Sequence, residues 1–426
     1  MIKKSYIIGL FFITIMLISC NSIIIRKIIP LEPENNSKNI STDVVFKWEY
    51  SGSSKADVEY DIYFGECVSD LSDENLTLIK SGLKTKQYKP EFELFKNKTY
   101  IWQIHMLSKG EEICRSELMR FETVKSVEGV EMIFIKSGIF TMGNTRNDCN
   151  GGIDEITHQV NLTYDYEISK NEISNVQFLH FLNSSGSISS KGILKGRQLI
   201  NIDSEFCEIE YVSNEFKLKK EKQGKENYPV ILVTWWGAIE FCNWLSEVSG
   251  LSKSYDLNGI LLNFPDNNGY RLPTEAEWEY SARGGENDDK TDSDYIYSGG
   301  NDIEDYTWYL TNSENPKYPI YEGKGTHETG TKSANEAEIH DMSGNVLEWC
   351  HDWYGNYKGT PQTNPVGPLV SSGRGRVVRG GCWSFGSLYC RVSARLFLNP
   401  DSSYSYLGFR IVRRCRKFQQ ADIKNQ

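Results

Sequence analysis

The stretch that decides the fold is Arg379-Gly380-Gly381-Cys382-Trp383-Ser384, near the end of this 426-residue chain. Cys390-Arg391 follows it, and Leu407-Gly408-Phe409-Arg410 closes the region. In this region helix signals are weak, whereas glycines, aromatic residues and Asn or Asp turns are dense. We therefore expect little regular secondary structure here.

Upstream, three segments have the pattern of short amphipathic helices. Residues 174–182 and 234–245 place apolar side chains at helical spacing. In a third segment, Thr274 precedes residues 275–280, and Glu277 stands where a capping box needs it. Residues 132–143 read as a strand, a glycine turn and a second strand, which predicts a hairpin.

Before these helices, residues 30–124 predict a β-sandwich. Short runs at 44–48, 58–64 and 100–106 alternate apolar and polar residues between Gly, Asn, Ser and Lys clusters. Trp48 would be the buried core tryptophan of an early strand. The segment resembles a fibronectin type III or immunoglobulin-like module, which usually serves as a spacer or a protein-binding unit.

The N-terminus predicts export. Lys3 and Lys4 precede an apolar run, residues 6–18, which is short for a membrane span but suits a signal peptide. The run ends in Leu17-Ile18-Ser19-Cys20, which resembles a bacterial lipobox, with Cys20 as the lipidated first residue of the mature protein. An uncleaved anchor helix is the alternative. Either way, we expect a protein of the bacterial cell envelope, outside the cytoplasm.

These patterns give a domain plan. A lipoprotein signal peptide spans 1–19 and a tether 20–29, followed by the sandwich at 30–124. A linker at 125–129 leads to a second domain at 130–415, and a tail spans 416–426.

Charge and cysteine content restrict the partners and the chemistry. The chain has a net charge of −10, which argues against nucleic acid and against attraction to anionic headgroups. Membrane attachment would therefore rest on the lipid at Cys20. Ten cysteines minus that one leave an odd number, so a monomer has at least one unpaired thiol.

The second domain resembles the formylglycine-generating enzyme, or sulfatase-modifying factor, family. Six motifs occur in the order that this family shows: residues 132–143, 228–230 before the 235–245 helix, 270–280, 341–349, 379–381 and 407–410. The resemblance implies a mixed α/β fold related to the C-type lectin fold. The fold class is therefore α+β: a β-sandwich followed by an irregular, C-type-lectin-like domain.

Several residues in these motifs predict internal structure rather than substrate contact. We expect Arg271 to form an ion pair with Glu275 or Glu277. Trp278, Trp349 and Trp353 should fill the core that sparse helices cannot.

The resemblance also implies a structural calcium ion. In that family the segment matching 341–348 holds Ca²⁺, and the carry-over gives the side chains of Asp341 and Glu348 with the carbonyls of Gly344 and Val346. Carboxylate and carbonyl oxygens are the hard ligands that Ca²⁺ prefers. Asp341 stands where the family usually has Asn, which keeps an oxygen donor. A metal-free turn capped by Glu348 is the alternative.

The family's chemistry needs two thiolates in a Cys-x-x-x-x-Cys loop just after Arg-Gly-Gly. They bind Cu(I), which activates O₂ to oxidise a substrate cysteine to formylglycine. Counting from Gly381, Phe385 occupies the first thiol position and cannot bind copper, and Cys390 falls at the second. Cys382 stands where the family commonly has Ser.

Cys382 and Cys390 therefore have several possible fates. They could form a surrogate copper site or a disulfide with each other, Cys390 could form a disulfide with Cys242, or both thiols could be buried and unpaired.

Two functions follow from these possibilities. The first is a lipid-anchored envelope protein that lacks the standard Cys pair and binds a protein or glycan partner. The second is a copper-dependent oxidase that forms formylglycine in a sulfatase through Cys382 and Cys390.

Overall fold

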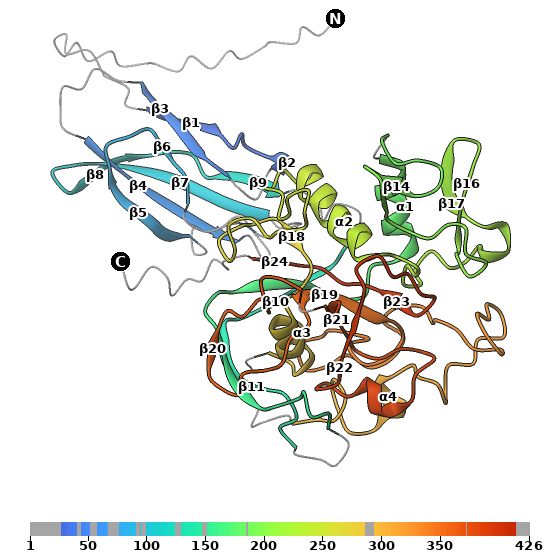
Figure 1. Ribbon diagram of the computed structural model, residues 1–426. Coiled ribbons are helices and arrows are strands. Elements are labelled where there is room, and N and C mark those ends of the chain that lie inside the picture. Colours follow the sequence, from blue (N-terminus) through green and yellow to red (C-terminus); the bar gives the residue numbers. More distant parts are fainter. Residues whose placement is uncertain are drawn as a thin grey trace, which may run out of the picture. The chain divides into compact units, whose positions relative to one another are not determined.

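The computed structural model describes residues 27–40, 44–51, 58–66, 76–90, 94, 99–123, 129–146, 151–184, 186–285, 294–371 and 373–414. Cys20 and the predicted signal peptide lie outside them. The described residues divide into two compact units: the first takes in those within 27–37, 45–89 and 100–121, and the second consists mainly of those from 122 onward. Strands dominate and helices are few (Figure 1). In the described parts, no helix combines the length and the apolar character needed to cross a membrane.

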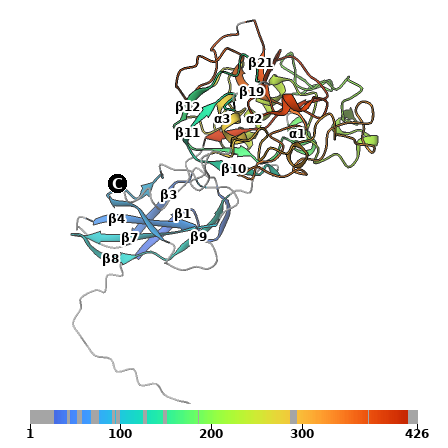
Figure 2. The same ribbon diagram turned by 90° about the horizontal axis from the view of Figure 1, so that it is seen from below.

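Two sheets contain the strands of the first unit. One has the order β1-β3-β6, and the other has the order β2-β9-β7-β4-β5 with β8 paired to β7. Figure 2 shows β4 and β7 side by side. The strands are β1 (Lys27–Glu32), β2 (Ser37–Ile40), β3 (Phe46–Ser51), β4 (Val58–Glu66), β5 (Thr77–Leu83), β6 (Gln87–Tyr88), β7 (Thr99–Ser108), β8 (Glu111–Arg115) and β9 (Met119–Thr123).

Aromatic side chains join these two sheets. The ring of Phe46 on β3 lies 4.9 Å from that of Trp102 on β7, and the ring of Trp48 lies 5.5 Å from that of Tyr60 on β4. Trp48 is 1% exposed, as predicted for a core tryptophan. The finer expectation, a fibronectin type III or immunoglobulin-like module, stays a prediction.

The described residues of the second unit form three small sheets and two short hairpins. The sheets have the orders β10-β13-β24-β18, β11-β12-β20 and β22-β21-β19-β23, and β14 pairs with β15 and β16 with β17. The strands are β10 (Met132–Ile135), β11 (Gly138–Met142), β12 (His158–Leu162), β13 (Tyr166–Ser169), β14 (Ile193–Leu194), β15 (Arg197–Gln198), β16 (Ile209–Val212), β17 (Glu215–Leu218), β18 (Tyr270–Arg271), β19 (Leu347–Trp353), β20 (Gln362–Thr363), β21 (Arg376–Arg379), β22 (Arg395–Leu398), β23 (Leu407–Gly408) and β24 (Val412–Arg414).

Among the described residues, the first three helices form where the sequence predicts them, whereas the short fourth helix was not predicted. The helices are α1 (Asn175–Ser184), α2 (Trp235–Val248), α3 (Glu275–Ala282) and the short α4 (Ile303–Tyr306), with 3₁₀ turns η3 (Lys220–Lys222) and η4 (Ser387–Cys390). The capping box of α3 is confirmed: Thr274 Oγ1 accepts from the Glu277 N–H at 3.1 Å, and Glu277 Oε2 accepts from the Thr274 N–H at 2.9 Å.

The C-terminal motif lies in the same core as the first two helices. Phe409 follows β23, and its ring lies 5.4 Å from that of Phe241 on α2 and 6.1 Å from that of Phe178 on α1. All three side chains are buried. Residues 407–410 thus anchor the end of the chain between two helices that are distant in sequence.

The hairpin predicted for residues 132–143 is wrong. Both strands exist, but β10 pairs with β13 and β11 pairs with β12, so they belong to different sheets. Between them, the Ser137 N–H donates to Asp165 Oδ1 at 2.8 Å instead of to a cross-strand carbonyl. The chain therefore crosses from one sheet to the next at this point.

Two of the three predicted core tryptophans are fully buried. Trp278 and Trp349 are both 0% exposed, which confirms the prediction. Trp353 is only half-buried, because it lies at the end of β19, and its ring contacts the Arg376 guanidinium at 3.8 Å and lines a surface pocket.

Candidate functional site

The candidate site is the loop that leaves β21 and runs from Gly380 to Cys390. Gly380 and Gly381 both have positive φ, at 95° and 73°, which other residues rarely adopt. A Cβ on Gly381 would lie 2.6 Å from Cys390 Sγ and 2.8 Å from the Tyr389 carbonyl oxygen. The glycine pair therefore lets the two arms of the loop approach each other closely.

Backbone and hydroxyl contacts fix this loop. The Gly344 N–H donates to the Gly380 carbonyl at 2.7 Å, and the Trp383 N–H donates to the Asn345 carbonyl at 2.9 Å. Ser343 Oγ donates to the Cys390 carbonyl at 2.8 Å. The loop is thus tied to the 341–348 segment, which places the two predicted sites next to each other.

The thiols of the loop are buried and free. Cys382 and Cys390 are each 0% exposed, and neither they nor Cys242 form a disulfide, so the two bridges considered from the sequence are not present. Burial raises the pKa of the Cys382 thiol to about 12. Burial, and then the neighbouring Cys382, also raise the pKa of Cys390. Both thiols are therefore protonated at neutral pH, whereas a metal ligand must be a thiolate.

These thiols should resist alkylation in the native protein. With a pKa of about 12, only about 1 in 10,000 Cys382 side chains is a thiolate at pH 8, and the sulfur is also covered. Iodoacetamide at pH 8, followed by mass spectrometry, should leave Cys382 and Cys390 unmodified under conditions that fully alkylate a urea-unfolded sample. Equal rates of alkylation in the native and the unfolded sample would contradict this expectation.

A pocket of about 420 Å³ opens beside the loop at Phe385. Its wall includes residues of the loop, of β22 and of the segment before β23, among them Ser384, Phe385, Gly386, Tyr389, Leu396, Leu398 and Tyr406. The Phe385 ring lies 5.3 Å from that of Tyr389 and 5.2 Å from that of Tyr406. Sequence reasoning identified Phe385 but missed the other aromatic residues; the run Tyr404-Ser405-Tyr406 could have drawn attention to them.

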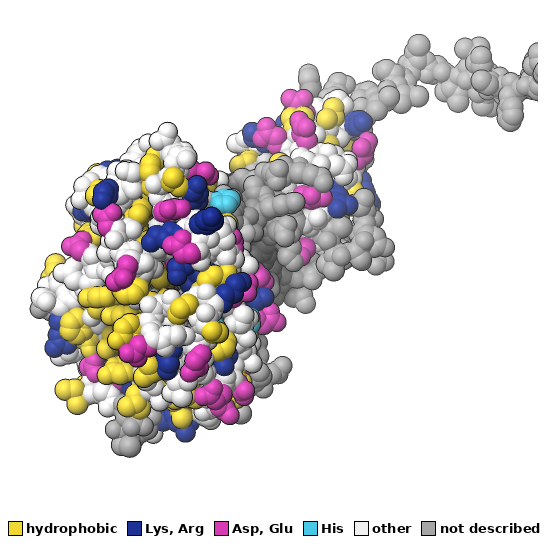
Figure 3. Space-filling view, turned by 90° about the vertical axis from the view of Figure 1, so that its right-hand side faces the viewer, with side chains coloured by type: hydrophobic (Ala, Val, Ile, Leu, Met, Phe, Trp, Pro, Cys, Tyr) yellow, Lys and Arg dark blue, Asp and Glu magenta, His cyan; other side chains and the backbone are white. Residues whose placement is uncertain are grey.

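Large apolar side chains near this pocket are exposed. Leu388, Tyr389, Phe397 and Tyr404 are 51%, 49%, 43% and 40% exposed. The space-filling view shows hydrophobic side chains gathered over part of the surface of the second unit (Figure 3). Exposed apolar side chains beside a concave site are typical of a binding surface.

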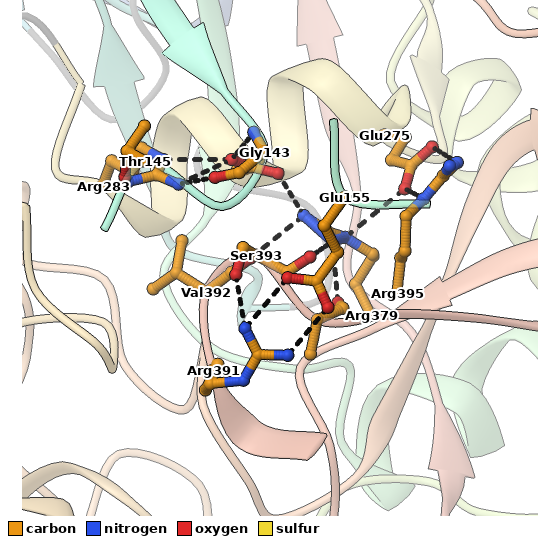
Figure 4. Close-up of polar contacts among 12 residues, drawn as sticks. Gly143, Thr145, Glu155, Glu275, Arg283, Arg379, Arg391, Val392, Ser393 and Arg395 are labelled. Carbon is orange, nitrogen blue, oxygen red and sulfur yellow. Dashed lines mark hydrogen bonds and ion pairs between the residues drawn. The ribbon is translucent and has the colours of Figure 1, made fainter. Parts of the chain in front are cut away.

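Buried ion pairs fix the two residues that flank the loop, Arg379 and Arg391 (Figure 4). Arg391, which follows Cys390, donates to both carboxylate oxygens of Glu155 at 2.9 and 2.7 Å. Arg379 donates to Glu279 at 2.5 Å and to the Val392 and Ala394 carbonyls at 3.0 and 2.7 Å. These two arginines thus help to position the loop.

The predicted ion pairs of α3 are also present. Arg271 pairs with Glu277 through two hydrogen bonds of 2.6 Å, while Glu275 pairs with Arg395 at 2.8 and 2.6 Å. The prediction left open which acid is the partner of Arg271, and the structure selects Glu277. These residues lie in the interior, as expected for residues that support the fold.

The predicted calcium ligands lie together, but only part of the set is available. Both carboxylate oxygens of Glu348 are held, by Arg410 at 2.7 and 2.8 Å and by the Trp278 indole N–H at 2.7 Å. Asp341 Oδ2 accepts from the Gly330 N–H at 2.7 Å, whereas its buried Oδ1 has no hydrogen-bond partner. Within the described residues, no group of three or more His, Cys, Asp or Glu side chains has a metal-holding arrangement.

A third carboxylate, missed from the sequence, joins this cluster. Glu172 is 2% exposed and accepts from Asn345 Nδ2 at 2.7 Å and from the Val346 N–H at 3.1 Å. Burial, and then Asp341 and Glu348, hold its pKa well above the ordinary value. Burial likewise raises the pKa of Asp341. Three acids and one arginine form a cluster that a divalent cation would neutralise, so Asp341 Oδ1 fits the role of a cation ligand.

Comparisons with known proteins show what this chain is similar to. Residues 118–415 match the family model described as sulfatase-modifying factor enzyme 1-like domain. The chaperone protein LppX of Paenibacillus barcinonensis is 36% identical over 183 residues, which cover 37% of this chain and 60% of that protein. The formylglycine-generating enzyme of Mus musculus is 27% identical over 307 residues, which cover 66% of this chain and 74% of the enzyme. Among solved structures, Treponema denticola variable protein 1 aligns with a TM-score of 0.47 and 27% identity, over 66% of this chain and 94% of that chain.

Proposed function

Since this chain belongs to the family of sulfatase-modifying factor enzyme 1-like domains, we propose that its second unit is a non-catalytic member that binds a partner protein of the cell envelope. The observation that carries this proposal is Phe385, which stands at the first thiol position and lines the apolar pocket. Family membership alone does not fix the activity, because the relatives carry names as different as chaperone and formylglycine-generating enzyme.

The thiols argue against the oxidase alternative. A Cu(I) site needs two accessible thiolates, whereas Cys382 and Cys390 are buried and carry raised pKa values. A phenylalanine ring at position 385 supplies no ligand. An oxidase acting through this pair would need the loop to open and both thiols to lose their protons.

The lining of the Phe385 pocket favours a protein partner over a glycan. Its side chains are aliphatic and aromatic, apart from the hydroxyl groups of Ser384, Tyr389 and Tyr406. A sugar needs several hydrogen-bonding groups for its hydroxyls, and the described residues of the wall include no carboxylate, amide or guanidinium side chain. An apolar side chain of a partner protein would fill such a pocket well, with the exposed Tyr389 at its edge.

The envelope location is part of the proposal. We infer that Cys20 carries the lipid anchor and that the first unit acts as a spacer between the anchor and the binding unit. Of the ligand set expected for a structural calcium ion (Asp341 and Glu348 with the Gly344 and Val346 carbonyls), Asp341 Oδ1 would be the first ligand, because the Glu348 oxygens are already held by Arg410 and Trp278. Bound there, the ion would supply positive charge to a buried acidic cluster.

The oxidase alternative has a direct test. The purified chain, reduced copper and O₂ are incubated with a peptide that carries the sulfatase Cys-x-Pro-x-Arg motif, and the peptide is analysed by mass spectrometry. We expect only unmodified cysteine. Formylglycine that disappears in Cys382→Ser and Cys390→Ser variants would overturn the non-catalytic proposal.

The partner is tested by site-specific crosslinking in the native envelope. A photoreactive phenylalanine analogue at Tyr389 should yield one major crosslinked protein, which is lost when Phe385 is also changed to Ala. The same analogue at Leu369, which is 90% exposed, serves as the matched control. Crosslinks to carbohydrate alone, or the same products from both positions, would contradict a protein partner.

A further inference from the structure

A second pocket, of about 300 Å³, lies away from the Phe385 loop. It forms where the end of β19 meets the start of α3 and the segment 355–368, and it has no lining residue in common with the Phe385 pocket. Its volume is at the small end of the range for ligand pockets, which suits a single ring rather than a chain.

The pocket contains one buried carboxyl group that is only partly used. Asp352 is 3% exposed and lines the pocket. Its Oδ2 accepts from the Glu275 N–H at 2.9 Å; among the described residues this is the one hydrogen bond of the carboxyl group. Burial, and then Glu275, raise the pKa of Asp352 to about 8, so the group is mostly a neutral acid at pH 7. It can therefore donate one hydrogen bond into the pocket without bringing a charge.

The other buried charges in the pocket wall cancel. Arg395 and Glu275 form a buried bidentate pair at 2.8 and 2.6 Å, and Arg395 also donates to the Gly355 carbonyl at 2.9 Å. Figure 4 shows this pair at one edge of the buried network. Neither group is available to an ion, which argues against a small anion or a cation as the ligand. Lys358 also lines the pocket, but it is exposed.

Aromatic and polar side chains complete the wall. Trp353 and Tyr357 line the pocket together with His158, whose ring lies 4.6 Å from that of Tyr357. Gln362 and Asn356 add amide groups. A flat apolar ring beside several hydrogen-bonding groups suits a ligand with one apolar face and many hydroxyls.

We propose that this pocket binds the ring of a single neutral hexose-type sugar, with its apolar face toward Trp353 and a hydroxyl hydrogen-bonded to Asp352. A sugar with about 12 non-hydrogen atoms should bind with a dissociation constant on the order of 1 mM. The site goes beyond the proposed function, since it is a separate pocket with a different class of ligand.

The test measures binding of glucose, galactose, mannose and N-acetylglucosamine to the full chain by saturation-transfer NMR and calorimetry. We expect at least one of them to bind. Val366→Trp, which fills the pocket from its wall, should weaken binding at least tenfold, as should Asp352→Ala. Asp352→Asn, which keeps a donor and an acceptor, should stay within about threefold of the wild type. Thermal melting of each variant shows whether it folds. If Asp352→Ala does not fold, the binding measured with Val366→Trp still decides the test.

Three results would overturn the proposal. The first is that none of these sugars binds at 10 mM, about ten times the expected dissociation constant. The second is that the Val366→Trp variant binds sugar as well as the wild type does. The third is that glucuronate or acetate binds more tightly than every neutral sugar. Tyr389→Ala is the matched control, because it alters the Phe385 pocket and should leave sugar binding unchanged. Failure of the sugar test thus leaves the proposed protein-binding function intact, and the reverse is also true.

Discussion

Replacing Glu277 by glutamine should lower the free energy of unfolding by about 3–5 kcal/mol, the usual cost of leaving one member of a buried ion pair alone. Glu277 is 0% exposed and accepts from Arg271 at 2.6 Å through each oxygen. It also accepts from the Tyr164 hydroxyl at 2.7 Å and from the Thr274 N–H at 2.9 Å. Glutamine keeps the shape but leaves the Arg271 charge uncompensated. Urea unfolding followed by tryptophan fluorescence measures the loss.

The matched control is an ion pair on the surface. Lys191 and Asp203 lie 2.8 Å apart, with side chains 61% and 68% exposed. Lys191→Met should change the free energy of unfolding by less than about 1 kcal/mol, because water screens such pairs. Equal losses from the two substitutions would show that burial of the Glu277 pair is not what stabilises the fold.

The pH dependence gives this prediction a second readout. Burial alone would raise the pKa of Glu277, but the Arg271 guanidinium holds it below its ordinary value of 4.5. The native state therefore favours the ionised form more than the unfolded state does. The stabilisation is present above about pH 4.5 and is lost as the pH falls through the native pKa. The Glu277→Gln variant should lack this part of the acid-induced loss of stability.

Elements set by local sequence were predicted well. The capping box needs only Thr274 and Glu277 three residues later, and it forms as expected. The hairpin at 132–143 was wrong because strand pairing depends on partners that are distant in sequence. β10 pairs with β13, which in turn pairs with β24 near the end of the chain. A glycine turn between two apolar runs does not carry that information.

Only those residues of the candidate site that lie in a recognised sequence motif could be predicted. The register from Gly381 identified Phe385, Cys382 and Cys390, but burial and raised pKa of the thiols depend on the surrounding core. The Arg391–Glu155 pair joins residues 236 positions apart. Glu172, likewise, reaches the 341–348 segment from the chain before α1. Such contacts become visible only in three dimensions.

The acidic cluster around Asp341 leads to the last prediction, which concerns calcium. Glu172, Asp341 and Glu348 are all buried, and burial raises the pKa of both Glu172 and Asp341, which the Arg410 guanidinium only partly opposes. With all three acids ionised, the cluster carries two uncompensated negative charges, and buried charges without partners are costly. One divalent cation at Asp341 Oδ1 would balance them. Calcium should therefore stabilise the native state.

At a calcium concentration about 100 times the dissociation constant, the gain should be about 2.7 kcal/mol. For a unit of this size that corresponds to a rise in Tm of about 5–10 °C, which EGTA should reverse. Asp341→Ala should abolish the response, whereas Asp203→Asn, an exposed carboxylate, should keep it. A Tm that neither calcium nor EGTA changes would overturn the cation site. The raised pKa values of Glu172 and Asp341 would then mean that protons, rather than a metal ion, neutralise the cluster.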